Sequence, residues 1–117
     1  MKRTIVKLSH QGGAREYASP HVRKGWAVTQ SVDQLGEVHK FDRSYRVTHA
    51  RIGALIPYTS ANTLSEAVAL CNVLARHYPN QWPRAKFGVP PKITKALGTE
   101  IRERLLRARK RLEKARG

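Results

Sequence analysis

The chain has 117 residues, which is enough for one domain with a modest hydrophobic core. Its 23 lysines and arginines outnumber its 8 aspartates and glutamates, and the resulting net charge of +15 excludes an ordinary surface that mixes both signs evenly. The single cysteine, Cys71, excludes an internal disulfide bond, and no apolar run approaches the ~18–20 residues of a membrane span. We therefore expect a cytoplasmic protein that does not enter a membrane.

The positive charge is concentrated at the two ends of the chain. Residues 1–25 carry six basic residues and one acidic residue, a net charge of +5. Residues 26–80 carry five and four, a net +1, and residues 81–117 carry twelve and three, a net +9. A nearly neutral middle between strongly basic ends is expected of a protein that binds a polyanion. The alternative is a solvated charged surface with frayed termini.

Two segments near the N-terminus favour β-strands. Residues 3–9 form a short strand-like run, and in residues 25–32 apolar side chains such as Trp26 and Val28 alternate with polar ones. Between these segments, a glycine pair and a Ser-Pro step predict a loop over residues 10–20.

Three further strands are predicted in the middle of the chain, over residues 37–41, 45–50 and 54–58. They are separated by turn-like compositions at residues 33–36, 42–44 and 51–53. Pro57 cannot donate a hydrogen bond to a sheet, so the last strand is expected to lie at an edge or to end there. Turns this short predict an antiparallel β-meander of four to five strands.

One amphipathic helix is predicted to cover this sheet. Thr63 and Glu66 have the spacing of a capping box, and Pro79 stops the helix after residue 78. The apolar residues that share one helical face are Leu64, Ala67, Val68, Cys71, Leu74, Ala75 and Tyr78. This face is the clearest core signal in the chain.

The remaining residues predict an arm and a basic helix. Residues 79–92 are rich in proline, and residues 93–97 are expected to form a helical turn closed by Gly98. Thr99 would then cap the last helix, although a single helix bent at Gly98 is an alternative. The fold class is thus α+β, with a core domain over residues 1–78, a proline-containing arm over 79–99 and a basic C-terminal helix over 100–117.

The C-terminal helix is predicted to be amphipathic. Its apolar residues recur at spacings of four and three, namely Ile101, Leu105, Ala108, Leu112 and Ala115. We expect this seam to dock on the body while the basic side chains face outward. The same spacing is compatible with a short zipper, so a monomer and a homodimer both remain open.

The basic residues of the C-terminal helix, the arm and the N-terminus predict a nucleic-acid-binding surface. Arginine forks suit phosphates and guanine edges, and lysines suit phosphates. The predicted binding residues are Arg84, Lys86, Lys92, Lys95, Arg102, Arg104, Arg107, Arg109, Lys110, Arg111, Lys114, Arg116, Lys2, Arg3, Arg23 and Lys24. We expect contacts to phosphates with little sequence preference, and DNA is slightly favoured over RNA as the partner.

The large aromatic residues are expected to pack rather than to stack on bases. Trp82 and Phe87 lie between the basic residues of the arm, which is also a pattern of single-strand binding. A chain with so few large aromatic residues needs them for its core, however, so we expect both rings to anchor the arm and Trp26 to be buried.

No catalytic constellation is recognisable, and we expect a protein that is not an enzyme and has neither a metal site nor a cofactor. The five histidines lack paired metal-ligand spacing, although His39 and His49 could face each other across a hairpin. Cys71 lies on the predicted buried face of a helix, which disfavours a nucleophile. Glu37 and Asp42 form the only close carboxylate pair of the body and have no obvious third partner.

Two other functions remain open. The basic surface could dock on an acidic protein surface, as an inhibitor or assembly factor of a phage or mobile element would. It could also belong to a permanent component of a ribonucleoprotein, which would need RNA for its solubility.

Overall fold

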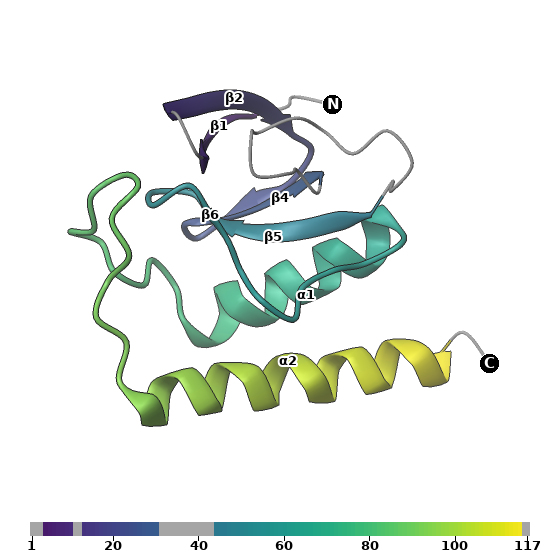
Figure 1. Ribbon diagram of the computed structural model, residues 1–117. Coiled ribbons are helices and arrows are strands. Elements are labelled where there is room, and N and C mark those ends of the chain that lie inside the picture. Colours follow the sequence, from purple (N-terminus) through teal and green to yellow (C-terminus); the bar gives the residue numbers. More distant parts are fainter. Residues whose placement is uncertain (1–3, 11–12, 31–43, 116–117) are drawn as a thin grey trace.

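A computed structural model of the chain describes residues 4–10, 13–30 and 44–115. These residues form six strands and two helices: β1 (Thr4–His10), β2 (Gly13–Ser19), β3 (Val22–Arg23), β4 (Trp26–Gln30), β5 (Tyr45–His49), β6 (Ala54–Leu55), α1 (Leu64–His77) and α2 (Lys95–Ala115). The last four strands form an antiparallel sheet in chain order, and β1 pairs with β2 in a separate antiparallel hairpin (Figure 1). The predicted α+β class with an antiparallel meander, one covering helix and a C-terminal helix is confirmed.

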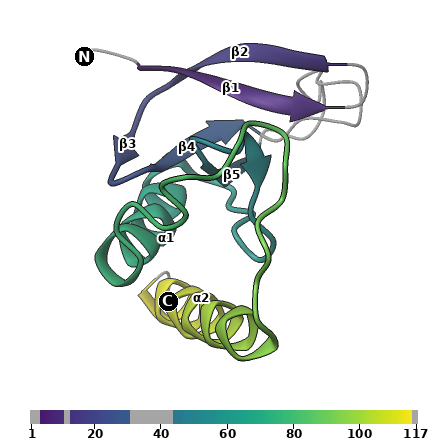
Figure 2. The same cartoon turned by 90° about the vertical axis from the view of Figure 1, so that its left-hand side faces the viewer.

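The elements are arranged in layers, with the hairpin on one face of the sheet and both helices on the other (Figures 1 and 2). Trp26, Val28 and Val47 point from the sheet into a core that they share with α1. Ile101 and Leu105 of α2 belong to the same core, so α2 is docked rather than detached. Full burial of a leucine side chain stabilises a fold by about 1.5–3 kcal/mol, and Leu105 is completely buried.

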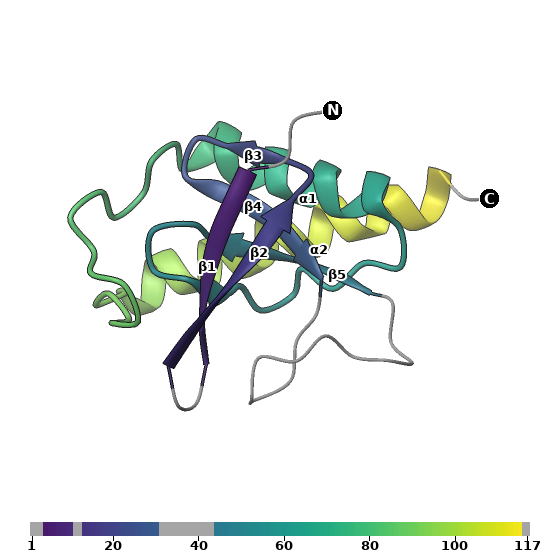
Figure 3. The same cartoon turned by 90° about the horizontal axis from the view of Figure 1, so that it is seen from above.

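The hairpin crosses the other face of the sheet (Figure 3). Ser19 donates its hydroxyl hydrogen bond to the carbonyl oxygen of Val28 over 2.7 Å, and the amide of Ser9 donates to the carbonyl oxygen of Gly53 over 2.8 Å. Gly53 has φ +75°, and a Cβ there would lie 2.4 Å from Cε2 of Phe87. Only glycine therefore fits between the hairpin and the arm.

The predicted loop over residues 10–20 is wrong, because β2 occupies most of it. β2 pairs with β1 along its whole length, from Ser19 opposite Thr4 to Gly13 opposite His10. Only its last residue is buried, and most of the others are exposed. An exposed strand shows little alternation of apolar and polar residues, so the sequence pattern did not reveal β2. Its hydrogen-bonded pairing with β1 stabilises the strand instead.

The predicted strand over residues 37–41 lies outside the described residues, as do residues 33–36 and most of the turn at 42–44. The strand predicted over residues 54–58 is shorter than expected, because β6 ends at Leu55. This end is consistent with the missing amide hydrogen of Pro57 two residues later.

Helix α1 closely follows its prediction. The hydroxyl of Thr63 accepts a hydrogen bond from the amide of Glu66 over 3.3 Å, as a capping box requires. The buried face differs from the predicted one at Leu64, which is exposed, at Val68, which is only partly buried, and at Leu70, which is buried although the predicted face omits it. A second layer explains the burial of Leu70, since α2 packs against α1 and widens its buried stripe.

Helix α2 starts earlier than predicted and is continuous. Its first turn is capped by Thr94, whose hydroxyl accepts from the amide of Leu97 over 3.1 Å. The amide of Gly98 donates to the carbonyl oxygen of Thr94 over 3.0 Å. The predicted break at Gly98, with a new cap at Thr99, is therefore wrong, and the alternative of one helix is the better description. A glycine costs a helix about 1 kcal/mol without ending it.

Candidate nucleic-acid interface

The apolar seam of α2 determines where its basic side chains point. Ile101 and Leu105 are buried, and Ala108 and Leu112 pack half-buried against the same core. This seam faces α1 and the sheet, as predicted, so it is already used within the chain and is not free for a zipper in this conformation. The basic residues are thereby distributed over the two flanks and the outer face of α2.

One flank of α2 forms a basic groove with α1. Arg76 from α1 and Arg104, Arg107 and Arg111 from α2 line a hollow of about 390 Å³, which we call the arginine groove. Its other polar side chains are Asn72 and His77 of α1, and no acidic residue lines it within the part of the chain that the structure describes. Because Arg104 is paired with Glu100, the positive potential of the groove comes mainly from Arg76, Arg107 and Arg111, and it favours an anion.

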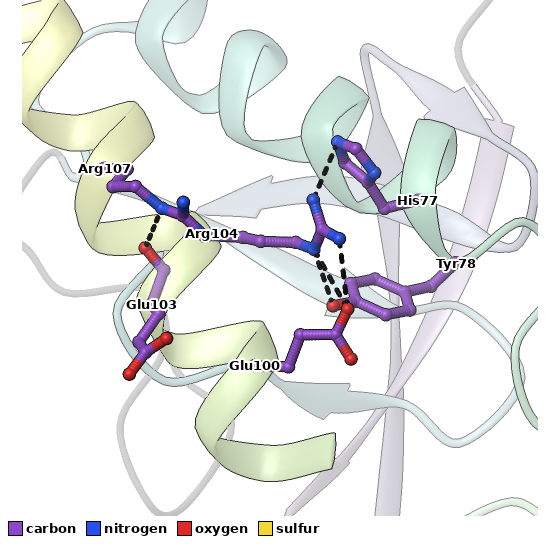
Figure 4. Close-up of polar contacts among 6 residues, drawn as sticks. All are labelled: His77, Tyr78, Glu100, Glu103, Arg104 and Arg107. Carbon is purple, nitrogen blue, oxygen red and sulfur yellow. Dashed lines mark hydrogen bonds and ion pairs between the residues drawn. The ribbon is translucent and has the colours of Figure 1, made fainter. Parts of the chain in front are cut away.

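Arg104 anchors this groove (Figure 4). Its guanidinium donates to Oε1 of Glu100 over 3.0 Å, and to the hydroxyl of Tyr78 over 3.1 Å. It also lies 3.4 Å from Nε2 of His77, across the junction of the two helices. Arg104 therefore ties α2 to the end of α1, whereas Arg107 and Arg111 are exposed, and Arg107 donates to the carbonyl oxygen of Glu103 over 3.4 Å.

Partial burial and the neighbouring arginines disfavour the protonated form of His77. Partial desolvation lowers its pKa below the ordinary value, and the positive charges of Arg104 and Arg76 lower it further. Neutral imidazole can accept the hydrogen bond that Arg104 offers. An anion in the groove would oppose this effect and raise the pKa of His77, because a negative charge favours the protonated ring.

Two acidic residues line a different hollow, while Glu100 pairs with Arg104 beside the arginine groove. A second hollow of about 200 Å³ on the other side of the α1–α2 seam is lined by Glu66 and Glu113 together with Arg109. Arg109 also donates to the carbonyl oxygen of Tyr58 over 3.3 Å. The residues that line the two hollows therefore differ in charge, which the summed charge of the sequence does not reveal.

The other predicted binding residues occupy several surfaces. Lys110 and Lys114 are exposed on α2, and Arg102 lines a separate apolar cavity on its other flank. Arg84, Lys86, Lys92 and Lys95 are exposed along the arm and at the start of α2. Lys2, Arg3 and Arg116 lie outside the described residues. The structure thus brings only part of the predicted set together in the groove.

Sequence reasoning missed the contribution of α1 to this basic surface. Arg76 and His77 follow the last apolar residues of α1 and line the groove, yet the predicted set contains neither. Asn72, which also lines it, is 2.9 Å from the His21 ring at the start of β3. Arg23 lies close enough to α1 for its charge to act on the Cys71 thiol. The basic surface therefore extends from β3 across α1 to α2.

The arm is fixed by aromatic packing. Trp82 lies half-buried against the core, with its ring centroid 6.2 Å from that of Trp26 and 5.4 Å from that of His49. Trp26 is buried, and its indole nitrogen donates to the carbonyl oxygen of Tyr78 over 2.9 Å. The expected core roles of Trp26 and Trp82 are confirmed, while Phe87 is partly exposed beside Gly53.

The sequence singled out Cys71 and several possible metal ligands, and the structure describes some of them. Cys71 is buried, and desolvation raises the pKa of its thiol to about 12, so little nucleophilic thiolate exists at neutral pH. Among the described residues, no three His, Cys, Asp or Glu side chains are grouped so that they could hold a metal ion. His39, Glu37 and Asp42, which the sequence singled out, lie outside these residues.

Comparisons with protein-family models, curated proteins and solved structures give no significant match to this chain. Neither of the helices in the described part of the chain is sufficiently long and apolar to cross a membrane. The function must therefore be inferred from the chemistry of its surfaces.

Proposed function

We propose that this protein binds nucleic acid without catalysing a reaction, and that the arginine groove holds the phosphates. The observation that carries this proposal is the convergence of Arg76 from α1 with Arg104, Arg107 and Arg111 from α2 on one groove. Guanidinium forks match the geometry of phosphate oxygens and stay charged at any physiological pH.

The spacing along α2 suits a chain of phosphates better than a single anion. Arg104 and Arg111 are seven residues apart, which corresponds to about 10 Å along a helix. Successive nucleotides of one strand rise about 3.4 Å each, so the row is comparable to three of them. Asn72 and His77 could add hydrogen bonds to phosphate oxygens from the α1 side of the groove.

The wider basic surface supports the same proposal. Lys110 and Lys114 lie on α2 beyond the groove, and Arg23 and Lys24 extend the surface beyond α1. Such contacts position a backbone but do not read bases, so we expect little sequence preference. Binding that neutralises about four phosphates on duplex DNA should give a log–log salt slope between about −3 and −4.

A paired substitution tests the groove itself. Replacing Arg107 and Arg111 by glutamine should reduce the salt slope by about 2, because each lost phosphate contact removes about 0.9. The matched control replaces Lys110 and Lys114 by glutamine, which removes the same charge from the same helix without touching the groove. Affinity for single- and double-stranded DNA and RNA is measured by fluorescence anisotropy at several salt concentrations.

The outcomes separate the groove from general electrostatics. A larger loss of slope for the arginine pair than for the lysine pair supports the groove. Equal losses would mean that binding depends only on the total charge of the protein and that the arginine groove is not a specific binding site. An affinity of the unaltered protein that does not change with salt would exclude phosphate binding altogether.

A further inference from the structure

An apolar cavity of about 280 Å³ lies on the flank of α2 that faces away from the arginine groove. It is enclosed by Ile93 of the arm, Leu105 of α2 and the segment after β6 that includes Pro57 and Tyr58. Trp26 and Trp82 also line it. This cavity is large enough for one sizeable side chain and is not used by the proposed nucleic-acid interface.

The ring nitrogens of Trp26 and His49, which line this cavity, are already engaged. The indole nitrogen of Trp26 donates to the carbonyl oxygen of Tyr78, and Nε2 of His49 lies 2.6 Å from the carbonyl oxygen of Gln81. The amide of Ile52 approaches Nδ1 of His49 at 3.3 Å, so both ring nitrogens have partners. Burial lowers the pKa of His49 and keeps its ring neutral. A nucleobase would therefore find few partners for its polar edges, and burying those edges without partners is costly.

Two residues of the cavity wall have unusual backbone conformations. Tyr58 has φ +66° and Trp82 has φ +54°, in the left-handed region that residues with side chains rarely adopt. Such conformations persist only where the surrounding structure enforces them, and they concentrate at binding sites. Both strained residues present aromatic rings to the same cavity.

Several large apolar residues in and beside the cavity wall are exposed to solvent, which is unusual for residues of a core. Tyr58 is 46% exposed and Ile93 is 47% exposed, although both line the cavity. Leu106 is 40% exposed and follows Arg102 by one helical turn on the same flank of α2. An apolar patch beside a cavity is typical of a surface that contacts another protein.

The charges near the mouth of the cavity are positive. Arg102 is exposed and is the only charged residue among the described residues that line the cavity, and Lys92 and Lys95 lie on either side of Ile93 in the chain. A second copy of this chain, which carries a net charge of +15, would bring like charges together and is disfavoured. An acidic partner would instead gain both attraction to the rim and burial of an apolar side chain.

We propose that this cavity is a docking site for an acidic protein segment, which inserts one large apolar side chain between the arm and α2 while its carboxylates meet Arg102. The site is independent of the arginine groove, so the protein has two binding surfaces on opposite flanks of one helix.

Capped tripeptides provide the test. The probes are N-acetyl-Glu-Leu-Glu-amide and N-acetyl-Glu-Phe-Glu-amide at millimolar concentration, with N-acetyl-Glu-Ser-Glu-amide and N-acetyl-Gln-Leu-Gln-amide as controls. Trp26 and Trp82 are the only tryptophans of the chain, and both line the cavity, so tryptophan emission reports on its occupancy. We expect saturable changes with the Leu or Phe peptide, none with the Ser peptide, and an affinity about two- to fivefold lower for each carboxylate removed.

Gly98 allows a matched pair of variants. It lines the cavity, and a Cβ there would make an ordinary contact of 3.8 Å with Ile93. Gly98→Leu should fill the space and abolish peptide binding, whereas Gly98→Ala should leave it intact. Arg102→Gln, at an exposed position, should weaken binding of the Glu-Leu-Glu peptide and leave binding of the Gln-Leu-Gln peptide unchanged. This variant keeps the test valid even if Gly98→Leu does not fold.

Several results would overturn the proposal. These are no saturable response to either apolar peptide, equal binding of the Glu and Gln peptides, or an undiminished response in folded Gly98→Leu. An oligothymidylate response that Gly98→Leu abolishes would also overturn it, because the cavity would then receive a nucleobase. The Arg107→Gln, Arg111→Gln variant should bind the peptides normally, so failure of the nucleic-acid proposal leaves this test unaffected.

Discussion

The two flanks of α2 differ in chemistry although one helix supplies both. The flank that faces α1 presents Arg104, Arg107 and Arg111, and α1 adds Arg76 to form a basic groove. The other flank presents Gly98 and Leu105 to an apolar cavity that Arg102 also lines. The comparison teaches that a basic helix does not have a uniform surface, because the elements packed beside each flank decide what that flank can bind.

The largest expected effect is a loss of stability when the packing of α2 on the rest of the protein is weakened. Both surfaces beside α2, the arginine groove and the apolar cavity, depend on this packing. Leu105→Ala should lower the free energy of unfolding by about 2–5 kcal/mol, because Leu105 is fully buried in the core between α2, α1 and the sheet. The neighbouring Leu106→Ala should change it by less than about 0.5 kcal/mol, since Leu106 is exposed. Urea unfolding measures both, and equal effects would contradict the docking of α2.

A charge reversal on each flank sharpens the comparison. Arg76→Glu should weaken nucleic-acid binding about tenfold or more, since it places a carboxylate among the three arginines of α2. Arg102→Glu makes the same change of charge on the apolar flank and should weaken binding distinctly less. Anisotropy titrations with the same oligonucleotide compare the two variants, and similar losses would argue against a dedicated groove.

Gly98→Ala probes the flank that carries the cavity without altering charge. Its conformation is helical, and the added methyl group meets only an ordinary contact with Ile93. The substitution should therefore raise the free energy of unfolding by about 1 kcal/mol, because alanine favours a helix over glycine by this amount. Thermal or urea unfolding measures the change. A destabilised variant would indicate that Gly98 is needed for a bend that the structure does not show.

The smallest expected effect is a pH dependence of nucleic-acid binding through His77. Its pKa is lowered in the free protein by desolvation and by Arg104, Arg76 and Arg107, with Glu100 acting in the opposite direction. A bound phosphate should raise this pKa, so the complex holds more protons than the free protein between the two values.

Affinity should therefore increase as pH falls through that window and level off below the pKa of the free protein. Titrations between pH 7.5 and 5.5 measure the effect, with His77→Gln as the control that removes it. The change should stay below about tenfold, which corresponds to one unit of pKa shift. A pH dependence that persists in His77→Gln would assign it to another group.

Local sequence patterns correctly predicted those elements whose apolar residues recur with the period of a helix or a strand. The apolar spacing and the cap at Thr63 predicted α1, and the alternation around Trp26 predicted β4. The seam through Ile101 and Leu105 predicted how α2 docks. These signals depend only on neighbours within one or two turns of the chain.

Other features depend on partners that are distant in the sequence, and the predictions failed or were silent there. β2 has little apolar alternation because most of it is exposed, and its pairing with β1 makes it a strand. Gly98 lies within a continuous helix that Thr94 caps, so a residue that often ends helices was misleading. Arg76 was not selected because a single arginine at the end of α1 gains significance only when α2 lies beside it.

The amino-acid sequence by itself determined the excess of positive charge, its segregation toward the ends of the chain and the amphipathic character of both helices. Composition and periodicity encode these properties locally. Tertiary structure alone decided that α1 and α2 lie side by side, that arginines from both converge in one groove and that an apolar cavity opens on the opposite flank. The physical reason is that a site is made of side chains brought together by packing, and packing depends on the whole core rather than on any one segment.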